Sequence, residues 1–98
     1  MKGGYQRRTT DGVIGISGQP VRVYGANITS GASAGSVIFY DGTDGTGIAR
    51  LEEVGEPNIT VGVKNIPSGG LYFPAGCYVD LDAQASDVQV EYEQVIAR

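Results

Sequence analysis

The sequence has no histidine and no tryptophan, and it has a single cysteine among its 98 residues. Without histidine, the commonest general base and the commonest zinc ligand are missing. One cysteine, Cys77, excludes a disulfide within the chain and suits a reducing compartment of synthesis. Cys77 begins a run of alternating apolar residues, which predicts a buried structural thiol rather than a nucleophile. We therefore expect no enzyme activity, no catalytic residue, no cofactor and no bound metal.

Long apolar runs and helical periodicity are also absent from the sequence. No stretch approaches the ~20 apolar residues of a membrane-spanning helix, and no signal-peptide core follows Met1. No segment repeats apolar residues at the spacing of an amphipathic helix over three turns. These features predict a soluble protein that is made in the cytoplasm and has no membrane partner.

Basic residues are few and unevenly placed. The net charge is −4, and Lys2, Arg7 and Arg8 supply three of the seven basic side chains. The rest of the chain carries four basic and eleven acidic residues, a charge of −7. Such an acidic body lacks the clustered lysines and arginines of a nucleic-acid surface, so we expect no nucleic-acid partner. Residues 1–10 are polar and predict a mobile basic arm outside a domain at 11–98.

Glycine is abundant, with 16 residues, about twice the ordinary ~7% usage. Single glycines between short apolar runs are typical of turns in an all-β protein. The run from Val37 to Tyr40 contains four consecutive β-formers and leads into the turn dipeptide Asp41-Gly42. Val37 and Phe39 share one face of this strand, and Ile38 and Tyr40 share the other. Both faces are apolar, so one should meet the core and the other a second sheet or another subunit.

Further short strands follow at regular spacing. The other short strand-like runs lie at residues 13–16, 21–30, 48–54, 59–64, 77–83 and 87–93, of which 77–83 and 87–93 alternate most cleanly, and Leu71 and Phe73 lie in a long connection. Seven or eight strands at this spacing predict a single-domain antiparallel β-sandwich of jelly-roll or Greek-key type. Gly25 stands where the apolar phase changes within 21–30, which predicts a β-bulge. The predicted core residues are Phe39, Leu51, Val61, Val79, Leu81, Val90 and Tyr92.

Carboxylates occur in two pairs at i, i+2, Asp80 with Asp82 and Glu91 with Glu93. Side-by-side carboxylates could serve a glycosidase or a calcium site. The oxygen-rich loop 41–47 matches no EF-hand spacing because it lacks the closing glutamate. Solvated acidic faces and turn chemistry explain these features without a ligand.

Tyrosine is the more informative residue type, with six in the chain. Aromatic residues and arginine are enriched at protein interfaces, and several tyrosines lie opposite predicted core positions. The candidate partner-binding residues are Tyr5, Arg7, Arg8, Tyr24, Ile38, Tyr40 and Tyr78.

Four segments carry a resemblance to a known group of proteins. They are Val21-Arg-Val-Tyr-Gly-Ala-Asn-Ile-Thr-Ser-Gly31, Gly35-Ser-Val-Ile-Phe-Tyr-Asp-Gly-Thr43, Pro67-Ser-Gly-Gly-Leu-Tyr-Phe-Pro-Ala-Gly-Cys-Tyr-Val-Asp-Leu-Asp82 and Val88-Gln-Val-Glu-Tyr-Glu93. In this order they resemble small β-sandwich structural proteins of tailed bacteriophages, over residues 21–93. The resemblance implies a virion component present in many copies and synthesised in the cytoplasm of a bacterial host.

Two hypotheses follow for its place in the particle. The first is a capsid decoration or cement protein on the head surface, which forms a homo-oligomer, with a trimer as the first expectation, and binds the major capsid protein or another virion protein. The alternative is a neck, tail or fibre component whose β-sandwich binds a carbohydrate or a receptor.

Overall fold

The computed structural model describes residues 3–95, and all regular structure in that range is β. The strands are β1 (Gly3–Arg8), β2 (Gly12–Ile14), β3 (Val21–Ser30), β4 (Ser36–Asp41), β5 (Ile48–Val54), β6 (Thr60–Gly62), β7 (Leu71–Phe73), β8 (Cys77–Leu81) and β9 (Ala85–Gln94). Every strand pair is antiparallel. Within the described residues, no helix is long and apolar enough to cross a membrane. The predicted all-β class is confirmed, with nine strands instead of seven or eight.

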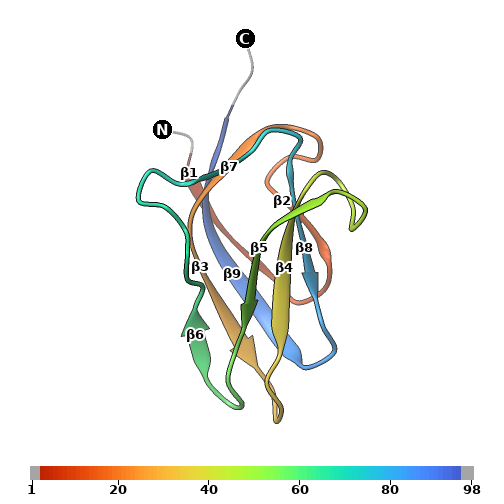
Figure 1. Ribbon diagram of the computed structural model, residues 1–98, viewed down its shortest axis with the longest axis vertical. Helices are drawn as coiled ribbons and strands as arrows, with labels where there is room; N and C mark the ends of the chain where they lie inside the picture. The colour runs from red at the N-terminus through yellow and green to blue at the C-terminus, as the bar shows by residue number, and fades with distance from the viewer. Residues whose placement is uncertain (1–2, 96–98) are drawn as a thin grey trace.

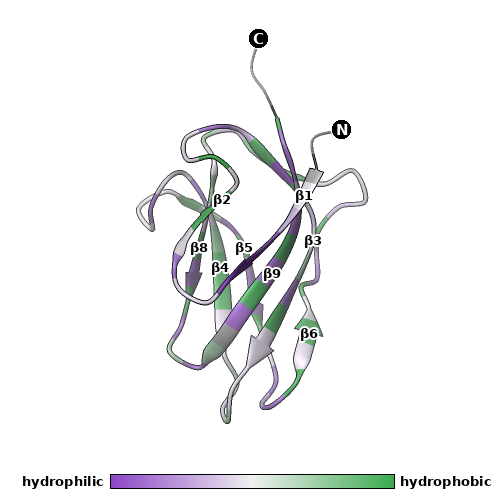
Figure 2. Ribbon diagram, turned by 180° about the vertical axis from the view of Figure 1, so that it is seen from behind, coloured by the Kyte–Doolittle hydropathy of each residue, from purple (hydrophilic) through white to green (hydrophobic). Residues whose placement is uncertain are grey.

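The strands form two sheets that pack face to face. Sheet A has the order β1-β9-β3-β6, with β7 also paired to β3, and sheet B has the order β2-β8-β4-β5. Sheet B lies nearer the viewer in Figure 1, and sheet A lies nearer in Figure 2, which is turned by 180°. Each sheet interleaves strands from the two ends of the chain. This strand order is that of a jelly roll, with β7 as a short additional strand.

The core lies between the two sheets and is apolar throughout. Its buried members are Ile14, Val21, Val23, Ile28, Val37, Phe39, Leu51, Phe73, Cys77, Val79, Leu81, Val88 and Val90. The rings of Phe39 and Phe73 meet across the sandwich, with their centroids 6.4 Å apart. Of the seven predicted core residues, five are buried, and the other two, Val61 and Tyr92, are partly buried against the cluster.

Inward and outward side chains alternate along β4 as predicted. Val37 and Phe39 are fully buried, while Ile38 and Tyr40 lie on the outer face of β4 and are half-buried. In Figure 2, β9 carries hydrophobic and hydrophilic bands in alternation. The register between β3 and β9 shifts next to Gly25, so the predicted bulge is present there.

The N-terminal segment differs from the prediction of a separate arm. Residues 3–8 form β1, which pairs with β9 from Gly3 opposite Glu93 to Arg8 opposite Val88. The hydrogen bonds and side-chain contacts of an edge strand hold this segment without an apolar pattern of its own. The arm prediction is therefore wrong for residues 3–8, and Met1 and Lys2 lie outside the described residues.

Polar side chains on the inner side of β1 close the edge of the sandwich. The Gln6 amide donates to the carbonyl of Val13 at 3.0 Å and accepts from the backbone N–H of Gly15 at 2.8 Å. Arg8 donates to the carbonyls of Thr10 and Asp11, at 3.0 and 3.2 Å. These bonds join β1 of sheet A to the start of sheet B, where side-chain hydrogen bonds take the place of apolar packing.

Candidate interaction surfaces

The seven candidate partner-binding residues do not form one site. Three of them, Tyr5, Arg7 and Tyr24, belong to the outer face of sheet A. Three others, Ile38, Tyr40 and Tyr78, belong to the outer face of sheet B. Arg8 points inward to the turn between β1 and β2 and is already bonded within the chain. The structure therefore separates two candidate surfaces on opposite sides of the molecule.

An apolar row crosses the outer face of sheet B. The strand registers place Val13 opposite Tyr78, Tyr78 opposite Tyr40, and Tyr40 opposite Ala49. The rings of Tyr40 and Tyr78 are in tilted contact, with centroids 6.5 Å apart. Val13, Tyr40 and Tyr78 are half-buried and Ala49 is exposed. The apolar row, as we call these four residues, spans all four strands on a face that a lone sandwich would present to water.

Carboxylates border the apolar row. Ile38 lies next to it, with Asp80 opposite on β8 and Glu52 opposite on β5. Burial first, and then the carboxylate of Asp11, raise the pKa of Asp80. Burial, and next the carboxylates of Asp11 and Asp80, also raise the pKa of Tyr78. The outer face of sheet B therefore combines apolar area with negative charge.

The loop between β4 and β5 extends over the same face. A Cβ placed on Gly45 would lie 4.0 Å from both Asp80 Oδ2 and a ring carbon of Tyr78. The hydroxyl and the backbone N–H of Thr46 donate to Asp44, and these bonds lower the pKa of Asp44. Among residues 3–95, no group of three or more His, Cys, Asp or Glu side chains is placed to hold a metal ion. The hydrogen bonds from Thr46 to Asp44 stabilise this part of the loop as a turn.

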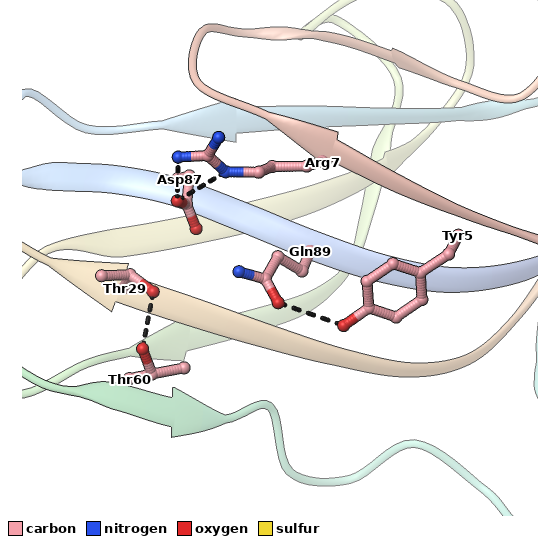
Figure 3. Close-up of polar contacts among 6 residues, drawn as sticks. All are labelled: Tyr5, Arg7, Thr29, Thr60, Asp87 and Gln89. Atoms are coloured by element: carbon pink, nitrogen blue, oxygen red, sulfur yellow. Dashed lines mark hydrogen bonds and ion pairs between the residues drawn. The ribbon is translucent and has the colours of Figure 1, made fainter.

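The outer face of sheet A carries a polar network (Figure 3). Arg7 on β1 pairs with Asp87 on β9, with 2.7 Å between Nη2 and Oδ2. The hydroxyls of Thr29 and Thr60 are 2.7 Å apart and join β3 to β6. Cross-strand pairs of this kind add stability to the sheet that presents them. They join β1 to β9 and β3 to β6 on the solvent side of the sheet.

Three tyrosines lie on this face of sheet A, each from a different strand. The hydroxyl of Tyr5 donates to Gln89 Oε1 at 3.1 Å, and its side chain is prominently exposed. The hydroxyl of Tyr24 donates to Glu93 at 2.7 Å, and this bond is the main cause of the raised pKa of Tyr24. Tyr72 is also exposed, and the Arg22 guanidinium lies 4.9 Å from the centre of its ring.

Cys77 belongs to neither surface. Its side chain is fully buried in the core, as the sequence predicts. Burial, and next the charge of Asp41, raise the pKa of the thiol far above its ordinary value. A thiol that stays protonated is a poor nucleophile and a poor metal ligand. In this chain Cys77 acts as a small apolar core residue.

Sequence reasoning missed several members of both surfaces. Val13 and Ala49 complete the apolar row, and Gln89 anchors Tyr5. The parity of each strand assigns these residues to an outer face, but their alignment depends on the register between strands. That register is set by contacts between distant parts of the chain, and no local pattern states it.

Comparison with known proteins gives no assignment. The chain matches no protein-family model, no curated protein and no solved structure. The resemblance of residues 21–93 to bacteriophage structural proteins stays a hypothesis that rests on the four segments quoted above.

Proposed function

We propose that this chain is a non-enzymatic structural protein of a tailed-bacteriophage virion, a capsid decoration protein that binds and stabilises the assembled head. The observation that carries the proposal is the apolar row on the outer face of sheet B, with its border of carboxylates. The jelly-roll strand order and the resemblance of residues 21–93 add support, since viral capsid proteins use this fold.

The apolar row suits a protein interface in its composition. Tyrosines at the centre of an interface contribute much of the binding energy, and surrounding polar groups exclude water from them. Tyr40 and Tyr78 hold this central position on sheet B, between Val13 and Ala49. Removing them from water on assembly is favourable by roughly 25 cal/mol for each Å² of apolar surface buried.

The carboxylate border determines which surfaces fit. Asp80 and Glu52 flank Ile38 beside the apolar row, and Asp11 lies close to Asp80. A complementary surface therefore presents apolar side chains with basic residues around them, which speeds association and fixes orientation. We expect the capsid lattice to present such a surface, and we also expect a second copy of the chain to contact the apolar row. When many copies bind the same lattice, their individually weak contacts together give firm attachment.

A copy count on purified virions tests the place in the particle. Quantitative mass spectrometry compares peptides of this chain with peptides of the major capsid protein. A decoration protein should be present in hundreds of copies. A count of about a dozen or fewer contradicts the decoration role and supports the neck, tail or fibre alternative.

An attachment assay tests the surface. Particles that lack the protein are mixed with purified wild-type chain or with Tyr78→Ser, and bound protein is measured after sedimentation. Loss of the Tyr78 ring from the apolar row should weaken attachment by at least about tenfold. Ile59→Ser is the matched control, because Ile59 is also apolar and exposed but lies outside both sheets' outer faces, next to β6. Equal attachment of Tyr78→Ser and wild type refutes this surface.

A further inference from the structure

We propose that the outer face of sheet A binds a neutral saccharide, with the ring of Tyr5 as its stacking platform. This activity is separate from the apolar row on sheet B and does not depend on where the protein sits in a virion. Four features of the face carry the inference: an exposed and anchored aromatic ring, two glycines on the same face, side-chain oxygens next to those glycines, and the lack of an uncommitted positive charge among its described side chains.

Tyr5 is an exposed ring that is held in place. Its relative exposure is 64%, although its hydroxyl donates to Gln89 on the neighbouring strand. Figure 3 shows the ring nearly face-on beside β9, with its hydroxyl directed to Gln89. The C–H groups on one side of a pyranose form an apolar patch that matches the face of an aromatic ring. An anchored ring loses little side-chain entropy when a ligand stacks on it.

Two glycines lie on the same outer face, Gly25 two strands and Gly62 three strands from the platform on β1. Gly25 on β3 lies opposite Glu91, which in turn lies opposite Tyr5 on β1. Gly62 on β6 lies opposite Asn27. A Cβ added at Gly25 or Gly62 would have ordinary contacts of 3.5 and 3.6 Å, so packing requires neither glycine. Their effect is to leave room on the outer face for part of a ligand.

Side-chain oxygens that can bond a ligand lie next to these two glycines. The nearest atom to a Cβ at Gly25 is Oε1 of Glu91, and the nearest to one at Gly62 is Oδ1 of Asn27. A carboxylate accepts hydrogen bonds, and an amide both accepts and donates them. Sugar hydroxyls offer donors and acceptors around the rim of an apolar ring. A small number of such polar groups beside an aromatic platform is how sites fix the orientation of a polar ligand.

Charge on this face favours a neutral ligand over an anionic one. Arg7 is committed to Asp87 at 2.7 Å, and Arg22 lies over the ring of Tyr72. Glu91 and Glu93 add negative charge between these arginines. An anionic polysaccharide or a phosphate would meet repulsion from these two carboxylates, while both arginines already have partners on the face. A second copy of the chain is less suited as well, since the continuous apolar area lies on sheet B.

The experiment is an NMR titration of the ¹⁵N-labelled full chain with neutral hexasaccharides of gluco, manno and galacto configuration. The expected result is saturable movement of the backbone amide signals of Gly25, Asn27, Gly62 and Glu91 with at least one of the three. No saturable movement with any of them at about 10 mM overturns the proposal. Movement of the same signals on concentrating the protein alone assigns the face to a second copy and also overturns it.

Variants locate the binding on Tyr5. Tyr5→Ala should weaken the saccharide at least about tenfold, whereas Tyr5→Phe, which keeps the ring, should bind within about threefold of wild type. Gly62→Ala, which places a methyl group on the face, should weaken binding while the chain stays folded. Gly69→Ala is its control, because a Cβ at Gly69 meets nothing within 4 Å. Wild-type affinity in Tyr5→Ala refutes the platform.

Discussion

The guanidinium of Arg7 binds only one of the two carboxylate oxygens of Asp87. Its Nε and Nη2 lie 2.8 and 2.7 Å from Oδ2, while Oδ1 is buried without a hydrogen-bond partner among the described residues. The side chain of Asp87 is 7% exposed and that of Arg7 is 61% exposed. The pair joins β1 to β9, the two strands nearest the ends of the chain. Arg7 therefore pairs with the buried carboxylate of Asp87 and separates it from solvent.

Replacing Arg7 should lower the free energy of unfolding more than replacing the carboxylate of Asp87. Arg7→Ala leaves an ionised Asp87 with no partner and should cost about 1–2 kcal/mol of unfolding free energy, reduced from the buried-pair value because Arg7 is largely exposed. Arg7→Ala combined with Asp87→Asn should regain part of that loss. Urea unfolding of the two single variants and the double variant measures the coupling. Strict additivity of the variants would show that the pair is not coupled.

Gly35 should not tolerate a side chain. A Cβ there would lie 2.5 Å from the backbone nitrogen of Ala85 and 2.6 Å from its Cα, so the backbone must move. We expect Gly35→Ala to cost about 1–3 kcal/mol or to prevent folding. Gly69→Ala, with nothing near the added methyl, should be neutral or stabilising by about 0.4–1 kcal/mol. Thermal unfolding followed by circular dichroism compares them, and equal melting temperatures would contradict this close packing.

Shortening core side chains should test which residues of each strand face inward. Phe39 is fully buried against Phe73, and Leu81 is 9% exposed at the edge of the same cluster. Phe39→Ala and Leu81→Ala should each cost about 2–5 kcal/mol, with Phe39 at the upper end, against a typical total of about 5–15 kcal/mol. Ile38→Ala, which changes the outward neighbour, is the control and should cost less than either. An unchanged melting temperature in both core variants would disprove the assignment of inner and outer faces.

Strand parity could be predicted from the sequence, because it is a local property. Val37 and Phe39 alternate with Ile38 and Tyr40, and a strand sends successive side chains to opposite faces. The bulge at Gly25 could be predicted in the same way, from the change of apolar phase. In each case neighbouring residues carry the whole signal.

The strand β1 could not be found from such a signal. Its inward residues are Gly4, Gln6 and Arg8, none of them a large apolar residue. Gly4 is small because the ring of Tyr92 lies against it, 3.0 Å from an added Cβ. Gln6 bonds to Val13 in β2 and to Gly15 just after it instead of packing in the core. An edge strand held by polar side chains has no period-two hydrophobic pattern, so its composition suggests a solvated arm.

Several residues of the candidate surfaces could be predicted from the sequence, but the way in which the fold brings them together could not. The outward position of Tyr40 follows from parity, but its alignment with Tyr78 follows from pairing between strands distant in sequence. Tyr5 falls in the segment that composition assigns to a tail, and its exposure over sheet A depends on the pairing of β1 with β9. Register and sheet order arise from the whole fold.

Asp80 should make stability depend on pH. Burial, followed by the charge of Asp11, raises its pKa in the folded state. A raised folded-state pKa means that the contribution of Asp80 is fully present below its unfolded pKa and is lost as pH rises through the folded pKa. Asp80→Asn should therefore raise the melting temperature at about pH 7 and leave it unchanged at about pH 3, below the ordinary ~3.9 of aspartate. Circular dichroism melts at the two pH values measure the difference.

Asp82 is the matched control with the opposite sign. Burial alone would raise the pKa of Asp82, but hydrogen bonds from the backbone N–H of Gln84 and from Ser36 together lower it. Its contribution is present above the unfolded pKa and is lost as pH falls through the folded pKa. Asp82→Asn should thus lower the melting temperature at about pH 7. Shifts of the same sign in both variants would contradict these environments.

The last prediction concerns the state of the free protein in solution. The apolar row leaves Tyr40 and Tyr78 on the outer face of sheet B, with Ile38 beside them. We expect a homo-oligomer that covers this face, with a trimer as the first expectation. Static light scattering at micromolar concentration should then give three times the 10.2 kDa of the chain. A species of 10.2 kDa for the wild type would contradict the prediction.

Ile38→Lys separates the oligomer from the fold. The new ammonium group would stand between Asp80 and Glu52, which are its cross-strand neighbours, so the isolated sandwich can accept the charge. Burial in an apolar interface would cost more, because the ammonium group would lose its hydration there. Ile38→Lys should therefore keep its β-sheet circular dichroism and scatter as a monomer. Ile59→Lys, which charges an exposed apolar residue next to β6, should scatter as the wild type does. Dissociation by both variants would mean that added charge alone disperses the protein, and the apolar row would lose its role.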